Sequence, residues 1–170
     1  MYYIYTKKSI LLNTKGDTVY MISIQKSKTA DTRDYSKVTK KQLLDSSIQH
    51  IGDVELGHRF FCEKLLEATK THDHDKLSDI DGFHRDFATG FEQTGWWDNH
   101  RKVNRHHLLQ EDGVPEDVNL VDVLDMVVDC VMAGMGRSGD VYPLEISNDV
   151  LQQAFQNTVI MLKNNVRVVE

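Results

Sequence analysis

The segment 118–133, VNLVDVLDMVVDCVMA, most constrains the fold, because its helical pattern carries apolar residues around nearly the whole circumference. A helix that is apolar all round must be buried among other elements. Three aspartates, Asp122, Asp125 and Asp129, nevertheless fall on one stripe of this helix. A buried carboxylate is costly unless it is paired or binds a metal. Asp129, deepest in the apolar run, most needs such a partner, whereas we interpret Asp122 and Asp125 as a solvated acidic stripe.

Helical spacing of apolar residues extends over most of 40–163. Thr39 and Gln42 have the form of a capping box, which predicts a helix from about residue 40 that Gly52 and Gly57 could break or bend. Ser78 with Asp81 predicts another helix start. Further helices are expected over 96–108 and 148–163. The glycines expected to end the acidic helix are Gly134, Gly136 and Gly139, and the phenylalanines expected in the core are Phe83, Phe87 and Phe91.

The first 25 residues have β-strand character instead. Strand signals occur at Tyr2–Tyr5, 10–12 and 18–24, and the turn 15–17 contains a glycine, which predicts a β-hairpin. A small sheet is unstable alone in water, so it should pack on the helices or on another subunit, as in a homo-oligomer. Residues 25–38 are polar and aperiodic and are interpreted as a linker. We therefore expect a mostly α protein with an N-terminal β-hairpin and linker (1–38) and a helical domain (39–170).

Composition limits the partners and the compartment. A net charge of −6 argues against strong nucleic-acid binding, although a local cationic cluster can still bind a small anion. The sequence has neither a long apolar run for a membrane span nor the features of a signal peptide at Met1. Cys62 and Cys130 both fall in apolar helical patterns and do not form a disulfide framework. We expect a cytoplasmic protein.

The motif His72-Asp73-His74-Asp75-Lys76-Leu77 contains adjacent histidine and aspartate residues that can ligate zinc, iron, manganese, cobalt or nickel. Such a pair in a polar loop can equally be a solvated surface feature. The segment 96–108 adds further histidines, and His100 and His107 would share one helix face at a spacing of seven. A basic helix packed on its tryptophans is the alternative interpretation of this segment.

Taken together, the motifs resemble the HD-domain superfamily of metal-dependent phosphohydrolases, and more narrowly an uncharacterised branch of it from phages and bacteria with H-D-x-x-K and R-H-H motifs. The resemblance spans about residues 48–163 and leaves the hairpin unexplained. It implies an HD-like helical bundle. The segments that carry it are Ile48-Gln49-His50-Ile51, His72–Leu77, Trp97–His100, Arg105-His106-His107-Leu108 and Asp125–Cys130.

This resemblance implies a role for each matching residue. Lys76 favours His72-Asp73 over His74-Asp75 as the doublet, and Asp129 becomes the final aspartate. The first histidine would be His50, with His58 as the alternative. The implied ligands are His50, His72, Asp73, His100, either His106 or His107, and Asp129, which is enough for one or two divalent ions.

The function implied is hydrolysis of a phosphate ester on a nucleotide or a related small molecule. Asp73 and Lys76 would be catalytic, Asp73 by holding the metal and orienting the attacking water. Lys76, Arg101 and Arg137 would offset the charge of the phosphate. Two alternatives are a di-iron oxygenase, since some members of HD fold with extra histidines do redox chemistry, and a metal-stabilised binding protein without turnover.

Overall fold

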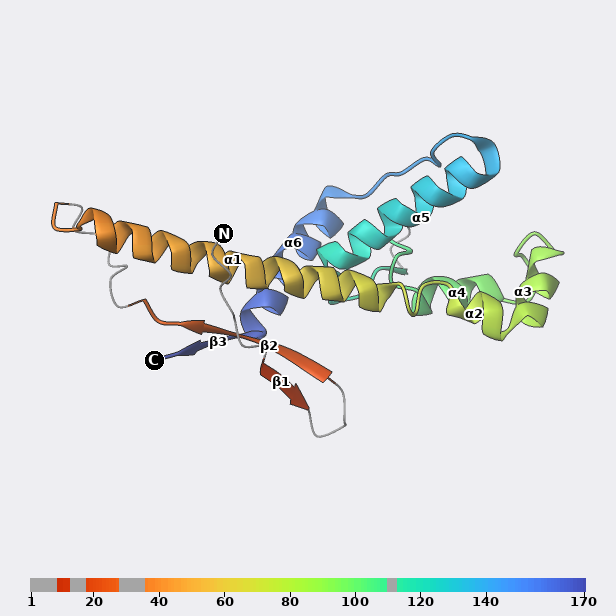
Figure 1. Ribbon diagram of the computed structural model, residues 1–170. Coiled ribbons are helices and arrows are strands. Elements are labelled where there is room, and N and C mark those ends of the chain that lie inside the picture. The colour runs from red at the N-terminus through yellow and green to blue at the C-terminus, as the bar shows by residue number, and fades with distance from the viewer. Residues whose placement is uncertain (1–8, 13–17, 28–35, 110–112) are drawn as a thin grey trace. The chain divides into compact units, whose positions relative to one another are not determined.

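The computed structural model describes residues 9–12, 18–27, 36–109 and 113–170. The described residues form six helices and a small sheet, which confirms the expected mostly α fold (Figure 1). They divide into two compact units, one of 1–62 with 161–170 and one of 63–160. This division does not test the predicted domain boundary at residue 38, which stays a prediction.

The first unit contains a three-stranded sheet in the order β1-β2-β3. Strand β1 (Ser9–Leu12) pairs with β2 (Thr18–Gln25) in antiparallel register, which confirms the predicted hairpin. Strand β3 (Val166–Val169) pairs with β2 in parallel and was not foreseen. The strand predicted at Tyr2–Tyr5, the turn 15–17 and residues 28–35 of the predicted linker lie outside the described residues.

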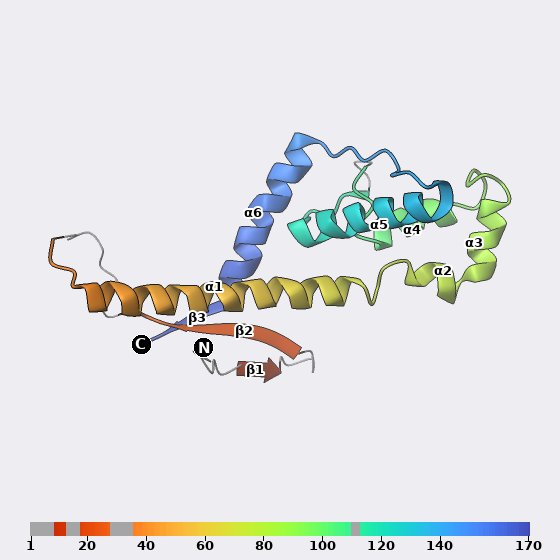
Figure 2. The same ribbon diagram turned by 45° about the horizontal axis from the view of Figure 1, so that its top comes forward.

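Helix α1 (Lys40–Ala68), which belongs to this unit up to Cys62, runs alongside the sheet (Figure 2). The predicted capping box is confirmed, because the Thr39 backbone N donates to Gln42 Oε1 at 2.9 Å and the Gln42 backbone N donates to Thr39 Oγ1 at 3.2 Å. Gln49 Nε2 donates to the Gln25 carbonyl at the end of β2 at 2.6 Å. Neither Gly52 nor Gly57 breaks the helix. This hydrogen bond joins the sheet to α1, and the expected packing of the sheet on the helices or on another subunit stays a prediction.

The second unit is helical and holds the main hydrophobic core. It contains α2 (His74–Ser78), α3 (Ile80–Phe87), α4 (Trp96–Val103), α5 (Leu120–Ser138) and the part of α6 (Asn148–Asn164) up to Ile160. The buried core residues are Leu108, Val118, Met126, Cys130 and Ala154. Cys130 is thus a core residue as predicted, whereas Cys62 of the first unit is exposed.

The acidic helix α5 is longer than predicted and begins at a buried polar cap. Gly134 and Gly136 lie inside the helix, which ends at Gly139 with φ 76°. A helical glycine costs only about 1 kcal/mol, so packing can override it. A side chain at Gly134 would in fact collide with the backbone of the returning segment, because its Cβ would lie 2.4 Å from the Asp140 carbonyl. The glycine therefore permits a close approach instead of ending the helix.

Asp122 is not part of a solvated stripe, contrary to our interpretation. Its side chain is 7% exposed and accepts from Arg105 Nε and Nη2, each at 2.8 Å. It also accepts from the backbone N of Asn119 at 2.9 Å and completes the capping box that begins α5. Asp122 thereby fastens the start of α5 to the segment that follows α4.

Two helices differ from the prediction at their ends. Helix α4 ends at Asn104, whose φ of −100° and ψ of 109° are extended, so 96–108 is not one helix. Helix α3 begins after Asp79, whose side chain accepts from the Gly82 backbone N, and not after Ser78. Phe87 on α3 is 61% exposed, which corrects its assignment to the core.

Among the described residues, no helix is long and apolar enough to cross a membrane.

Replacement of Asp122 should destabilise the protein far more than replacement of Asp117, although both carboxylates pair with Arg105. Asp122→Ala removes a buried acceptor of four hydrogen-bond donors and should lower the free energy of unfolding by about 2–4 kcal/mol. Asp117 is 80% exposed, so Asp117→Ala should cost less than about 1 kcal/mol. Urea unfolding of both variants measures the difference, and equal losses would contradict it.

Candidate metal centre

The doublet His72-Asp73 lies in the turn between α1 and α2, in an unusual backbone conformation. Asp73 has φ 56° and ψ 17°, in the left-handed region that few residues other than glycine adopt. Its backbone N donates to Asn104 Oδ1 at 3.0 Å. Asn104 is buried at the end of α4 and thereby holds the turn against the histidine segment. Aspartate tolerates this conformation better than most residues, and here it directs the side chain toward His100 and His106.

Four side chains converge at this turn. Their ligand atoms, from Asp73, His100, His106 and His107, all lie within 4.8 Å of one another. Asp73 Oδ1 is 3.3 Å from His100 Nε2 and 3.6 Å from His106 Nε2, and the Nε2 atoms of His100 and His107 are 2.9 Å apart. Ligands bound tetrahedrally at ~2.0–2.1 Å from a metal are ~3.3 Å apart. The described side chains are therefore spaced as the ligands of one ion would be.

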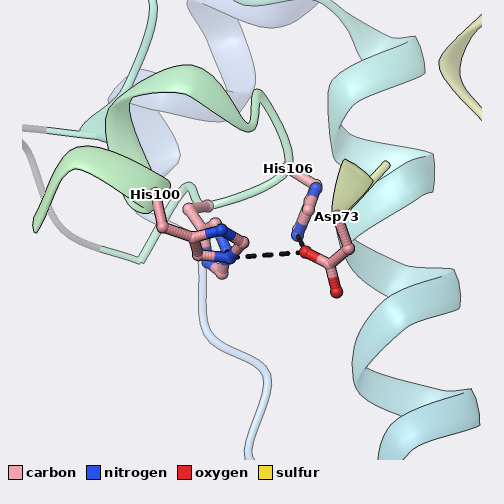
Figure 3. A group of neighbouring side chains, drawn as sticks. Asp73, His100 and His106 are labelled. Atoms are coloured by element: carbon pink, nitrogen blue, oxygen red, sulfur yellow. Dashed lines mark hydrogen bonds and ion pairs between the residues drawn. The ribbon is translucent and has the colours of Figure 1, made fainter. Parts of the chain in front are cut away.

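Two of these ligand atoms are buried and have no hydrogen-bond partner. They are Asp73 Oδ1 and His106 Nε2. Figure 3 shows the rings of His106 and His100 directed at the same carboxylate oxygen. A buried polar atom without a partner costs ~1–3 kcal/mol, and more if it is charged. A cation between these atoms would satisfy both at once, so the donor set fits a divalent metal.

The buried His100 meets a carboxylate at each ring nitrogen. Its Nδ1 is 2.8 Å from Asp75 Oδ2, and its Nε2 is 3.3 Å from Asp73 Oδ1. A neutral imidazole carries one hydrogen, so it can donate to only one of them. If Nδ1 donates to Asp75, the Nε2 lone pair points at Asp73 and is available to a metal. Histidines that bind metals commonly donate their second nitrogen to a carboxylate in this way.

A second group lies on the other side of Asp73. His72 Nε2 is 3.8 Å from Asp73 Oδ2 and 3.7 Å from Asp129 Oδ1. These three residues form a further set of atoms close enough to hold an ion. Asp73 thus faces the first group with Oδ1 and the second group with Oδ2, where the Lys76 ammonium also lies 2.6 Å away.

Asp125 corrects our interpretation of a solvated stripe. Its side chain is only 16% exposed, and its carboxylate lies 3.1 Å from His72 Nδ1 and 3.6 Å from His106 Nδ1. It therefore faces the nitrogens that point away from Asp73, as Asp75 does for His100. Asp129, expected to be deepest, is more exposed at 31%. The stripe on α5 was predictable from spacing, whereas the order of burial along it was not.

Electrostatics favour the ligating forms of these groups. Burial alone would raise the pKa of Asp73, but the nearby His100 ring and the Lys76 ammonium outweigh it and hold that pKa well below its usual range. Burial, reinforced by His106 and His100, lowers the pKa of His107 to about 3. Burial and the neighbouring His72 lower the pKa of His106. At pH 7 the site thus has an ionised Asp73 and neutral His106 and His107.

The structure brings together six of the seven predicted ligands: His72, Asp73, His100, His106, His107 and Asp129. His50 is not among them. The resemblance implied His50 as the first histidine, but α1 continues unbroken for 18 residues past His50 to Ala68, and 69–73 is a turn. His50 and its alternative His58 are exposed on α1 and belong to the other compact unit. Both His106 and His107 join the group, so the choice between them is not needed.

The predicted substrate-binding residues differ in their positions. Lys76 Nζ lies 2.6 Å from Asp73 Oδ2. Lys76 and Arg137 line a cleft of about 300 Å³ together with Asp73, His107 and Asp129. Arg101 does not line this cleft, and its Nη2 donates to Asp98 at 2.7 Å. Three participating residues were missed, namely Asp75, Asn104 and Asp125. The spacing of Asn104 four residues after His100 was a usable signal.

Comparisons with protein-family models, curated proteins and solved structures find no match to this chain. The resemblance to the HD-domain superfamily therefore stays a prediction. The close approach of buried histidine and aspartate side chains is a property of the described structure and does not depend on that resemblance.

Metal content should fall in steps as ligands are removed. Asp129 belongs only to the second group, so Asp129→Ala should lose one ion, whereas Asp73→Ala removes the shared carboxylate and should lose both. His72→Ala should also lose metal. His84→Ala is the control, because His84 lies outside these groups. Mass-spectrometric metal analysis of protein purified without added metal measures each content. Full occupancy in Asp129→Ala would exclude the second group.

The metal-free protein should lose stability on acidification before its carboxylates titrate. An unfolded histidine has a pKa of ~6.5, above the folded pKa of about 3 of His107. Between these values the unfolded chain binds more protons, so the free energy of unfolding falls as pH falls. Urea unfolding in chelator between pH 7.5 and 4.5 measures this slope. His107→Asn should flatten it, and an unchanged slope would show that folded His107 is protonated.

Proposed function

We propose that the protein is a metal-dependent phosphohydrolase acting on a nucleotide or a related small phosphate ester. The observation that carries this proposal is the pair of buried, unpartnered ligand atoms, Asp73 Oδ1 and His106 Nε2, within a cluster spaced like metal ligands. A cation bound between these two atoms would satisfy both of them. The imidazole and carboxylate donors of the cluster suit manganese, nickel, cobalt, zinc or iron.

One or two such ions would be held by the first group and the second group, with Asp73 shared. A bound divalent metal supplies Lewis-acid polarisation of a phosphoryl oxygen and lowers the pKa of water toward ~7. The remaining chemistry belongs to the side chains that surround the ligands.

Lys76 is placed to stabilise negative charge beside the ligands. Its ammonium lies 2.6 Å from Asp73 Oδ2, and its side chain is only 24% exposed. Partial burial strengthens the interaction of the ammonium with a phosphoryl oxygen, because the local dielectric is lower than that of water. Arg137 lines the same cleft and forms no ion pair with any described residue. Two cationic side chains and the carboxylates of Asp73 and Asp129 thus line the same cleft.

Asp73 cannot serve as a general acid in this site, because its lowered pKa keeps it ionised near pH 7. It can hold cations and accept a hydrogen bond from the attacking water. His107, neutral at the same pH, can donate a lone pair to a metal or accept a proton. These protonation states suit cation binding by Asp73 and either metal binding or proton acceptance by His107.

The proposal is tested by measuring phosphate release from a panel of nucleotides and sugar phosphates. The metal content is measured on the same preparation. Metal-dependent release supports the proposal. Metal without release from any ester would favour a binding protein, and two irons per chain with oxygen consumption would favour the oxygenase. Absence of metal would remove the ground for hydrolase and oxygenase alike.

Lys76→Met should separate catalysis from metal binding. The variant keeps much of the stem and removes the ammonium, whose charge matters most as the phosphoryl group reacts. We expect turnover to fall ~10-fold or more, about 1.4 kcal/mol or more in transition-state stabilisation, with metal content unchanged. Turnover and metal content of one preparation are the measurements. Undiminished turnover would remove Lys76 from catalysis, and lost metal would show that its pairing with Asp73 holds the doublet in place.

A further inference from the structure

A second cleft adjoins the metal cluster and has a different chemical character. It measures about 610 Å³ and is here called the aromatic cleft, being lined by Lys76, Ile80, Phe83, His84, Phe87, Phe91, Trp97 and Arg137. Lys76, Trp97 and Arg137 also line the cleft that contains the ligands. The two clefts are therefore neighbours and have these two cations and one indole in common.

The rings of the aromatic cleft are held in place by the backbone around them. Asp86 is fully buried, and its carboxylate accepts from the backbone N of Thr94 and of Trp97, each at 2.9 Å. Phe91 has φ 69°, a conformation that is strained for a bulky side chain. Its ring centroid is 4.8 Å from that of Trp97. The loop between α3 and α4 thus keeps two rings against each other beside the cluster.

One ring of the cleft remains open to solvent although it belongs to this aromatic set. Phe87 is 61% exposed, yet its ring centroid lies 5.5 Å from that of Phe91 and 6.2 Å from that of Phe83. Exposed single apolar residues are common, but a ring that completes a concave wall offers a face for stacking. Stacking of a planar ring on an aromatic side chain contributes ~1–3 kcal/mol.

Lys76 connects this wall with the ligands. Its Nζ lies 5.8 Å from the ring centroid of Phe83 and 5.6 Å from that of Trp97, while it contacts Asp73. A molecule with a planar ring at one end and a phosphate at the other would match the order of groups here. The ring would face Phe87 and Phe83, and the phosphate would lie between Lys76 and Arg137.

We infer that the aromatic cleft binds the planar aromatic ring of a phosphate ester whose phosphate faces the metal cluster. This inference rests on the proposed function for the orientation of the ester, and it narrows the substrate class to esters that carry such a ring. That specificity would be set by Phe83, Phe87 and Trp97, because sugar phosphates have no planar aromatic ring to cover this wall.

A binding experiment without a hydrolysable bond tests the inference independently of turnover. The chain has two tryptophans, so Trp96→Phe leaves Trp97 as the sole indole emitter. In that background, adenosine should quench the emission of Trp97 at saturation, and ribose should not. Phe87→Ala should weaken adenosine binding ~10-fold. The matched control is Phe155→Ala on α6, because Phe155 is 60% exposed in the same unit and lines neither cleft.

Kinetics then test the orientation of the ester. Phe87→Ala should lower kcat/KM for AMP ~10-fold and leave that for ribose 5-phosphate unchanged, whereas Phe155→Ala should change neither. An equal loss with 4-nitrophenyl phosphate would support recognition of any aryl ring, and a loss confined to AMP would support a nucleobase.

The failures of the two proposals are distinguishable. Adenosine that binds no better than ribose, or equal behaviour of Phe87→Ala and Phe155→Ala, overturns the aromatic cleft even if phosphate esters are hydrolysed. Adenosine binding that depends on Phe87, with no phosphate released from any ester, supports the cleft and overturns the proposed hydrolase.

Discussion

The direction of the Asp73 carboxylate is the constraint on which the rest of the second unit depends. Its oxygens face different histidines, and a left-handed backbone at this residue aims them. Asn104 makes that conformation tenable, because its Oδ1 accepts from the Asp73 backbone N while its Nδ2 donates to Asp75 Oδ1 at 3.0 Å. The turn and the end of α4 are therefore fixed to each other by one buried amide.

The same residue marks the end of α4. The His100 carbonyl accepts from the Asn104 backbone N at 3.0 Å, the last hydrogen bond of the helix, and from Asn104 Nδ2 at 3.0 Å as well. With Asn104 extended, His106 and His107 leave the helical path and turn back toward His100. A continuous helix would place His106 on a different face from His100 and His107. Ending the helix is thus what allows three imidazoles to meet one carboxylate.

The sequence predicts the fold better where the signal is local. The capping box at Thr39, the hairpin and the closing helix depend on neighbouring residues and were correctly predicted. Strand β3 depends on pairing with β2 more than 140 residues away, and its Val-Arg-Val-Val alternation is too short to stand out. The end of α5 was misplaced because the close approach at Gly134 is a tertiary effect.

The candidate site was likewise predicted better where the signal is local than where it depends on tertiary packing. Residue type and spacing predicted His72, Asp73 and the later histidines as candidate ligands, and the structure brings these side chains together. Asp125 was missed because the spacing of three carboxylates defines a stripe but not the rotation of α5 about its axis. That rotation is set by core residues such as Met126 and Cys130, which are buried on the neighbouring positions. Core packing depends on many residues at once, and it determines which carboxylate of α5 faces the histidines.

Lys76 shows how local and tertiary effects combine at this site. Three residues after Asp73, its backbone N bonds to the Asp73 carbonyl at 3.0 Å, so the first turn of α2 brings the ammonium over the carboxylate. Tertiary packing then places two aromatic rings within 6 Å of that ammonium. An ammonium near a carboxylate on one side and ring faces on the other is stabilised from both directions. A phosphate that enters there competes with Asp73 for a charge that is already held in position, so little reorganisation of Lys76 would be needed on binding.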